Sequence, residues 1–151
     1  MPPRFEFLMR IAADVGEILT MGGGPLGERR FVAITDGSFE GPQMRGRLEP
    51  GGADWQIVRA DGALDIDARY VLRTDAGARI RVVSQGYRHG PPEVLAALGR
   101  GEAVPPEKYF FRTVMRFETG APDLEWLNRT IAVASAERKA RQVLLEAWRL
   151  L

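Results

Sequence analysis

Apolar and polar residues alternate with a period of two along most of this chain, and glycine and proline interrupt the pattern at short intervals. The clearest case is the segment 64–74, and the segment 79–87 repeats it after the short turn at residues 75–77. A period of two is typical of a strand with one buried face. Two such strands joined by a tight glycine-containing turn predict an antiparallel hairpin.

The same pattern predicts further strands at residues 5–12, 31–35, 54–60, 108–119 and 130–136, and residues 38–49 can hold a short strand that is interrupted by glycine. The glycine-rich segment 20–27 is interpreted as a loop, and Asp36-Gly37 as a turn. Residues 92–98 predict one short helix, and residues 122–128 one helical turn. Residues 142–150 fit a strand or an amphipathic helix, and we expect a strand because the preceding segment would give it an antiparallel neighbour.

Eight to ten short strands with closely spaced turn signals are typical of a sandwich or a barrel. We expect an all-β fold, namely a single antiparallel up-and-down β-barrel, lipocalin-like in outline, with one or two short helices. The 151 residues show no shift in composition, and so residues 1–151 are predicted to form one domain.

Composition excludes several kinds of chemistry. The chain has no Cys and a single His, so it cannot build a disulfide scaffold, a thiol nucleophile or a Cys-based zinc site, and we expect no metal and no cofactor. The net charge of +1 is not that of a nucleic-acid-binding protein. No apolar run is long enough to span a membrane and no signal-peptide core follows the N-terminus, so a cytoplasmic protein is expected.

Three short motifs have structural interpretations. The Gly-x-Gly-x-x-Gly spelling at residues 22–27 contains Pro25 and precedes a predicted strand, whereas a dinucleotide site needs a helix there. His89 stands alone at a strand end and is interpreted as a surface or hydrogen-bonded residue. Gly86 lies inside a strand pattern, which indicates a bulge or a close backbone approach.

Several polar residues stand at strand ends or beside aromatic residues, as the lining of a ligand-binding barrel would. A carboxylate in an apolar pocket can act as a general acid or base, and Arg can stabilise an oxyanion. The candidate catalytic residues are Asp54, Arg69, Arg112 and Glu118. The candidate ligand-binding residues are Trp55, Tyr70, Arg88, Tyr109, Phe111 and Asn128. The alternative is that these side chains form ion pairs on the surface or inside the barrel without any catalytic role.

Several motifs together resemble a bacterial family known as domain of unknown function 3237. They are residues 41–42 (GP), 50–55 (PGGADW), 61–62 (DG), 64–70 (LDIDARY), 86–90 (GYRHG), 109–113 (YFFRT), 117–119 (FET) and 126–128 (WLN). The resemblance extends from about Phe5 to the C-terminus. It implies a single-domain antiparallel β-barrel in a soluble bacterial protein without an assigned activity. By resemblance, the recurring polar positions are Asp54, Arg69, Arg112, Glu118 and Asn128.

Three functions remain open on the sequence. The first is a binding protein whose barrel holds a partly apolar carbonyl or carboxylate compound, engaged by Arg69 or Arg112. The second is a cofactor-free isomerase, hydratase, lyase or cyclase in which Asp54 or Glu118 moves a proton. The third is a structural barrel that forms a homodimer or a higher homo-oligomer. The sequence does not decide whether the protein is an enzyme.

Overall fold

A computed structural model describes all 151 residues as nine strands, one α-helix and two short 3₁₀ helices, η1 and η2. In chain order the elements are β1 (Phe5–Gly24), β2 (Gly27–Glu40), β3 (Arg45–Leu48), β4 (Gly52–Val58), β5 (Leu64–Thr74), β6 (Arg79–His89), α1 (Pro92–Gly99), η1 (Pro106–Lys108), β7 (Phe110–Glu118), η2 (Pro122–Arg129), β8 (Ile131–Arg138) and β9 (Gln142–Leu150).

The strands form one antiparallel sheet that closes on itself. From β4 to β9 each strand pairs with the next one along the chain. The ring closes because β1 pairs on one edge with β2 and on the other with β9. This closure joins the two ends of the chain, with Phe5 opposite Leu150. The all-β antiparallel fold expected from the alternation is therefore confirmed.

Two short strands share one position in the ring. β3 pairs with the far end of β2 and with the end of β5, whereas β4 pairs with the first half of β2 and the first half of β5. The two strands thus follow one another between the same two neighbours. Since Pro50 and Gly51 separate them, the chain can shift sideways there before pairing resumes.

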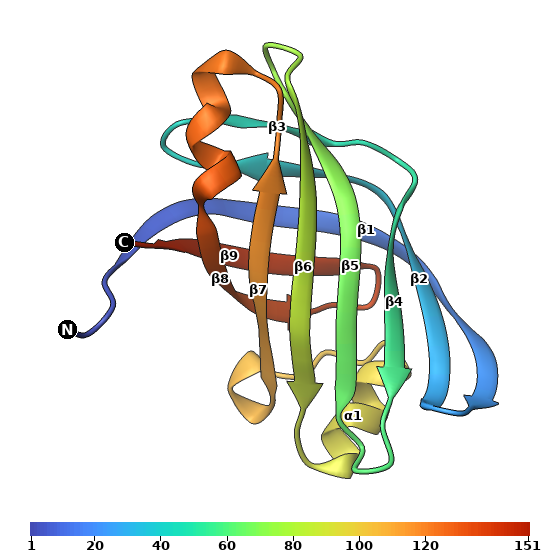
Figure 1. The fold of residues 1–151 in the computed structure, drawn as a ribbon. Helices are drawn as coiled ribbons and strands as arrows, with labels where there is room; N and C mark the ends of the chain where they lie inside the picture. The colour runs from blue at the N-terminus through green and yellow to red at the C-terminus, as the bar shows by residue number, and fades with distance from the viewer.

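The ring is uneven rather than round. Figure 1 shows β1 and β9 crossing behind β5, β6 and β7 at a steep angle. Inward side chains from both sides form one core of 28 buried residues, and Met9, Leu72, Ile80 and Met115 are among those fully enclosed. η2 lies at one end of the ring and buries Leu124 and Leu127, while α1 lies at the other and buries Leu98. With both ends covered, the interior is a packed core that contains one small cavity.

Two local predictions are wrong. The segment 20–27 is not a loop, because β1 continues to Gly24 and β2 begins at Gly27, which leaves a turn of two residues. Asp36-Gly37 does not end a strand either; it lies within β2, where the pairing with β1 shifts by one residue. Glycine allows a tight hairpin turn in the first place and a β-bulge in the second. Neither feature ends the pairing of β1 with β2.

The helices at 92–99 and 122–129 and the C-terminal strand at 142–150 agree with the sequence-based expectations. None of the helices has the length and the apolar character required to cross a membrane.

Candidate functional site

A cluster of polar side chains lies inside the ring, around a small cavity. Each member occupies an inward position of its strand, where the alternation would otherwise place an apolar residue. The members are Asp54 and Gln56 on β4, Tyr70 on β5, Ser84 and Arg88 on β6, Thr113 on β7 and Arg138 on β8. We call these seven residues the interior cluster.

The carboxylate of Asp54 lies between β4 and β5. Its Oδ1 accepts a hydrogen bond from the backbone N–H of Asp67 (3.0 Å), and its Oδ2 accepts one from Nε2 of Gln56 (2.8 Å). Backbone pairing of the two strands stops after Asp54 and resumes at Ile57, so this carboxylate replaces a backbone partner. Burial raises the pKa of Asp54, and these hydrogen bonds only partly oppose the rise.

Two guanidinium groups lie close to this single carboxylate. Arg88 and Arg138 are only 4% and 6% exposed, which is unusual for arginine. Burial, with the nearby charge of Arg138, lowers the pKa of Arg88 to about 10, so Arg88 stays protonated at neutral pH. Burial also lowers the pKa of Arg138. Neither arginine forms a salt bridge, and the guanidinium of Arg88 lies over the ring of Phe111 at 5.4 Å. With Asp54 ionised, the interior cluster carries one excess positive charge.

Three buried polar atoms of the interior cluster have no hydrogen-bond partner: Nε of Arg88, the hydroxyl of Tyr70 and Oε1 of Gln56. A buried polar group without a partner costs about 1–3 kcal/mol. The hydroxyls of Ser84 and Thr113, in contrast, bond to each other at 2.7 Å. The atoms without a partner are thus a cationic donor, a neutral donor and an amide acceptor.

The cavity that these residues line has a volume of about 50 Å³. Its remaining wall is apolar and comes mainly from β1, β2 and β9, through Val15, Val32, Ile34, Val143 and Leu145. A water molecule in the liquid takes up about 30 Å³, whereas pockets for drug-sized ligands measure about 300–1,000 Å³. The interior therefore has room for a group the size of a carboxylate beside an apolar surface.

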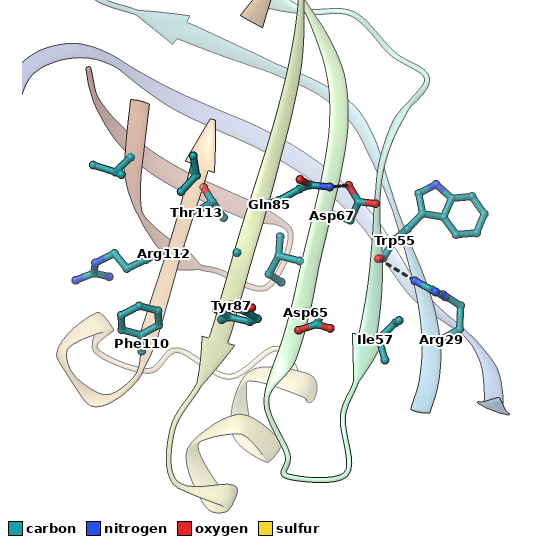
Figure 2. A pocket seen from close by; sticks show the side chains of 14 residues that line it. Arg29, Trp55, Ile57, Asp65, Asp67, Gln85, Tyr87, Phe110, Arg112 and Thr113 are labelled. Atoms are coloured by element: carbon teal, nitrogen blue, oxygen red, sulfur yellow. Dashed lines mark hydrogen bonds between the residues drawn. The ribbon is translucent and has the colours of Figure 1, made fainter. Parts of the chain in front are cut away.

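A second, larger hollow lies on the outside of the sheet. This outer groove crosses β4, β5, β6, β7 and β8, and its volume is about 720 Å³. Figure 2 shows Trp55, Asp65, Tyr87, Phe110 and Arg112 around it. It is open along its length and none of its side chains belongs to the interior cluster except Thr113. Size alone would favour this groove, but both buried arginines and three of the four buried atoms without a hydrogen-bond partner are in the interior; the fourth is Oδ1 of Asp65 in the groove.

The structure divides the residues singled out in the sequence between the two sides of the sheet. Five lie inside the ring: Asp54, Tyr70, Arg88, Tyr109 and Phe111. Of these, Tyr109 lies next to the interior cluster, since its hydroxyl accepts a hydrogen bond from the backbone N–H of Arg138 (2.9 Å).

Four others project from the outer face. Arg69 pairs with Asp67 at 3.3 Å, Trp55 packs edge-on against a neighbouring ring, and Arg112 and Glu118 are exposed. Asn128 is in η2, where it exchanges two hydrogen bonds with the backbone of Thr119. Asp54 therefore does not share a site with Arg69, Arg112 or Glu118, and its cationic neighbours are Arg88 and Arg138.

Sequence reasoning missed four members of the interior cluster: Gln56, Ser84, Thr113 and Arg138. A usable signal was present for Arg138. It continues the inward series Ala132, Ala134, Ala136 of β8, so a charged residue falls where the alternation requires a buried one. Polar residues at inward positions identify this interior better than polar residues beside aromatics do.

No group of three or more His, Asp or Glu side chains converges in a way that could hold a metal ion.

Fold and site together define the class: an antiparallel β-barrel-like protein with a desolvated, cationic polar cluster in its interior. Comparison with known proteins gives the family. A family described as "Protein of unknown function (DUF3237)" matches residues 3–150, and the chain belongs to it. The resemblance noted in the sequence is thereby confirmed.

Relatives include a UPF0311 protein of Rhodopseudomonas palustris, 38% identical over 153 residues, with 100% of each chain covered. Among solved structures, the conserved protein of unknown function from Rhodopseudomonas palustris superposes with a TM-score of 0.94 at 36% identity, covering 100% of this chain and 99% of the other. A β-barrel-like protein from Acinetobacter baumannii gives 0.87 at 42% identity, covering 100% and 98%.

A more distant structure shares the fold alone. It is described as an enzyme from Penicillium herquei, and it superposes with a TM-score of 0.76 at 23% identity, covering 100% of this chain and 96% of the other.

Proposed function

We propose that this protein binds a small, partly apolar carbonyl or carboxylate compound, whose polar head enters the interior cluster. The observation that carries the proposal is Arg88: a buried, protonated guanidinium with no salt bridge, whose Nε has no hydrogen-bond partner. An anionic oxygen would supply that partner and would offset the excess positive charge.

The other polar atoms without a hydrogen-bond partner suit the same ligand. The unpartnered hydroxyl of Tyr70 can donate a second hydrogen bond to a carboxylate or carbonyl oxygen. Burial raises the pKa of Tyr70, so this hydroxyl keeps its proton. The apolar wall on β1, β2 and β9 suits a short hydrocarbon chain, and the cavity volume of about 50 Å³ leaves little more than the space of the carboxylate, which limits that chain to one or two carbons. A short-chain monocarboxylate combines these properties.

Propionate is a suitable probe, and propylammonium chloride at equal ionic strength is its control. We expect calorimetric titration to show saturable binding of propionate and none of propylammonium, because the interior cluster attracts anions. Arg88→Met removes the charge and leaves an unbranched apolar side chain that occupies the inner part of the arginine's place. It should abolish propionate binding while leaving the fold intact.

The same variant separates a binding role from a structural one. Arg88 forms no salt bridge, so Met breaks no ion pair and removes the desolvation cost of a buried, unpaired charge, which is on the order of several kcal/mol. Arg88→Met should therefore unfold in urea at an equal or higher midpoint than the wild type. Propionate binding that survives Arg88→Met unchanged would refute the proposal.

Asp54 supports a second candidate, a cofactor-free enzyme that transfers a proton. Its raised pKa places a carboxylate suited to acid–base chemistry beside Arg88 and Arg138, which can stabilise a developing enolate oxygen. The Penicillium herquei protein of this fold is described as an enzyme. Isomerases, hydratases, lyases and cyclases that react through an enolate use such a step.

Hydrogen–deuterium exchange at carbon tests this chemistry without knowledge of the substrate. In D₂O, Asp54 would remove a proton from the carbon next to a carbonyl, and deuterium would return to it. NMR of pyruvate incubated with the protein should show loss of the methyl proton signal, which Asp54→Asn abolishes. Glu118→Gln is the matched control, because Glu118 lies on the outer face. Equal exchange by Asp54→Asn and the wild type would exclude the proton-transfer role.

A further inference from the structure

The outer groove presents opposite charges on the two strands that flank β6. The pairing register places Asp65 of β5 beside Tyr87 of β6, and Tyr87 beside Arg112 of β7. Figure 2 shows the three side chains in this order across the sheet. Tyr87 thus separates an acidic position from a basic one, and the two charges do not meet within the chain.

Both charges lack full partners. Oδ1 of Asp65 is enclosed without a hydrogen bond and forms an ion pair with Nη1 of Arg59 at 3.6 Å, but the side chain as a whole is still 43% exposed. The guanidinium of Arg112 stacks over Phe110 at 5.5 Å and donates to the carbonyl of Phe111 at 3.0 Å, but it has no acidic partner. A carboxylate with a free acceptor and a guanidinium with free donors are complementary.

The next row across the sheet is mainly apolar at its ends. Trp55 of β4, which is 43% exposed, lies at one side of the outer groove. Val114 of β7 and Val133 of β8 lie at the other side. Large apolar side chains that are exposed on the outer face of these strands include Tyr87, Phe110, Val114 and Ile131, and the polar side chains of Asp67 and Gln85 lie among them. Such a patch, bordered by charges, is typical of a protein–protein interface.

We propose that this outer groove is the interface of a homodimer. A two-fold axis that runs along β6, between two copies facing each other, places β5 of one copy opposite β7 of the other. Asp65 then lies opposite Arg112 of the second copy, twice by symmetry, and Trp55 lies opposite Val133. A groove that carries an acid on one side of the two-fold axis and a base on the other is complementary to a second copy of itself. A polyanion is a less suitable partner, because the carboxylates of Asp65 and Asp67 would repel it.

The extent of the face is sufficient for a modest dimer. Five strands about 4.8 Å apart span about 19 Å, and a nine-residue strand such as β7 is about 30 Å long. Their product, about 600 Å² per copy, is close to the lower limit of specific interfaces. We therefore expect a dimer that dissociates on dilution and weakens at high salt, since its ion pairs are partly exposed.

Charge exchange tests this arrangement. Asp65→Arg brings two arginines together at each contact, and Arg112→Glu brings two acids together. Each variant alone should be a monomer in analytical ultracentrifugation, with the dissociation constant raised at least about tenfold. An equimolar mixture should form a heterodimer, because every contact then pairs an acid with a base. Arg4→Glu is the control for Arg112→Glu, because it makes the same change of charge away from the outer groove. It should dimerise like the wild type.

A wild-type protein that stays monomeric at high micromolar concentration would overturn the proposal, as would single variants that remain dimeric. Monomeric variants that fail to associate when mixed would overturn the pairing of Asp65 with Arg112. Circular dichroism of each variant separates dissociation from unfolding. Analytical ultracentrifugation measures the mass of the particle, so its result does not depend on whether the interior cluster binds a carboxylate.

Discussion

At the scale of single residues, the position of a side chain on one or the other face of a strand decides its chemistry. Arg88 of β6 pairs with Phe111 of β7, and Arg112, the next residue of β7, pairs with Tyr87, yet Arg88 is buried and Arg112 is exposed. Burial lowers the pKa of Arg88 and leaves its Nε without a partner, whereas Arg112 can reach solvent. Two arginines close together in the sheet are thus suited to different roles: Arg88 to binding an anion in the interior, and Arg112 to contacts on the outer face.

Asp54 leads to a prediction about pH and stability. Because its pKa is raised in the folded state, the folded protein binds this proton more tightly than the unfolded chain. The free energy of unfolding should therefore decrease as the pH rises from about 4, the unfolded value, to the raised folded value, by about 1.4 kcal/mol per pKa unit between them. Asp54→Asn lacks this contribution.

Urea unfolding of the wild type and Asp54→Asn between pH 4 and 8 measures the effect as the difference between two curves. The difference should change with pH in the predicted direction and become constant above the folded pKa. Glu118→Gln serves as the control, since Glu118 is exposed. Parallel curves for the wild type and Asp54→Asn would contradict the burial of that charge.

At the scale of elements, close pairing of β6 with β7 depends on Gly86. A Cβ at this position would lie 2.0 Å from the carbonyl oxygen of Arg112, closer than any real contact. The glycine within the strand pattern therefore marks a close backbone approach, as the sequence indicated. The side chain missing at Gly86 lets the two strands stay hydrogen bonded where the interior cluster faces inward.

Gly86→Ala should destabilise the protein, because the added methyl group must push β7 away. We expect a loss of more than about 2 kcal/mol, well above that of an ordinary surface substitution. Gly23→Ala is the matched control, since a Cβ there meets nothing within 4 Å and the residue is also in a strand. Chemical denaturation of both variants gives the comparison, and equal midpoints would contradict this account.

At the scale of the whole molecule, the ring depends on pairing between the two ends of the chain. β1 and β9 pair from Phe5 opposite Leu150 to Asp14 opposite Gln142, and the backbone N–H of Leu151 bonds to the carbonyl of Arg4 at 2.9 Å. The termini are therefore adjacent, and a covalent connection between them would not disturb the sheet.

A circular permutant should exploit this closure. Joining the original ends by a short glycine–serine linker and opening the chain between Pro25 and Leu26, at the tip of the β1–β2 hairpin, should leave stability within about 2 kcal/mol of the wild type. Opening the chain between Val83 and Ser84, inside β6, should prevent folding. Far-UV circular dichroism and thermal melting distinguish these results; a folded β6 permutant or an unfolded hairpin permutant would contradict the prediction.

The sequence predicted much of the fold and three of the seven residues of the interior cluster, Asp54, Tyr70 and Arg88. Alternation identified β5 and β6, and Pro92 and Gly99 bounded α1, because these signals act between near neighbours. The glycines of 22–24 misled the prediction, since a glycine-rich stretch in isolation resembles a loop. The long hairpin forms there because β2 pairs with β4 as well as with β1, which is a contact distant in sequence.

What the sequence determined by itself is therefore most of the strands and, in β5 and β6, the face to which each side chain points, because a period of two is a property of extended backbone. The tertiary structure alone decided which inward residues meet. Asp54, Arg88 and Arg138 come from three separate strands, and only closure of the ring brings them around one cavity. Exclusion of water from that cavity raises the pKa of Asp54 and leaves the guanidinium of Arg88 without an anionic partner. No pattern in the local sequence encodes that burial.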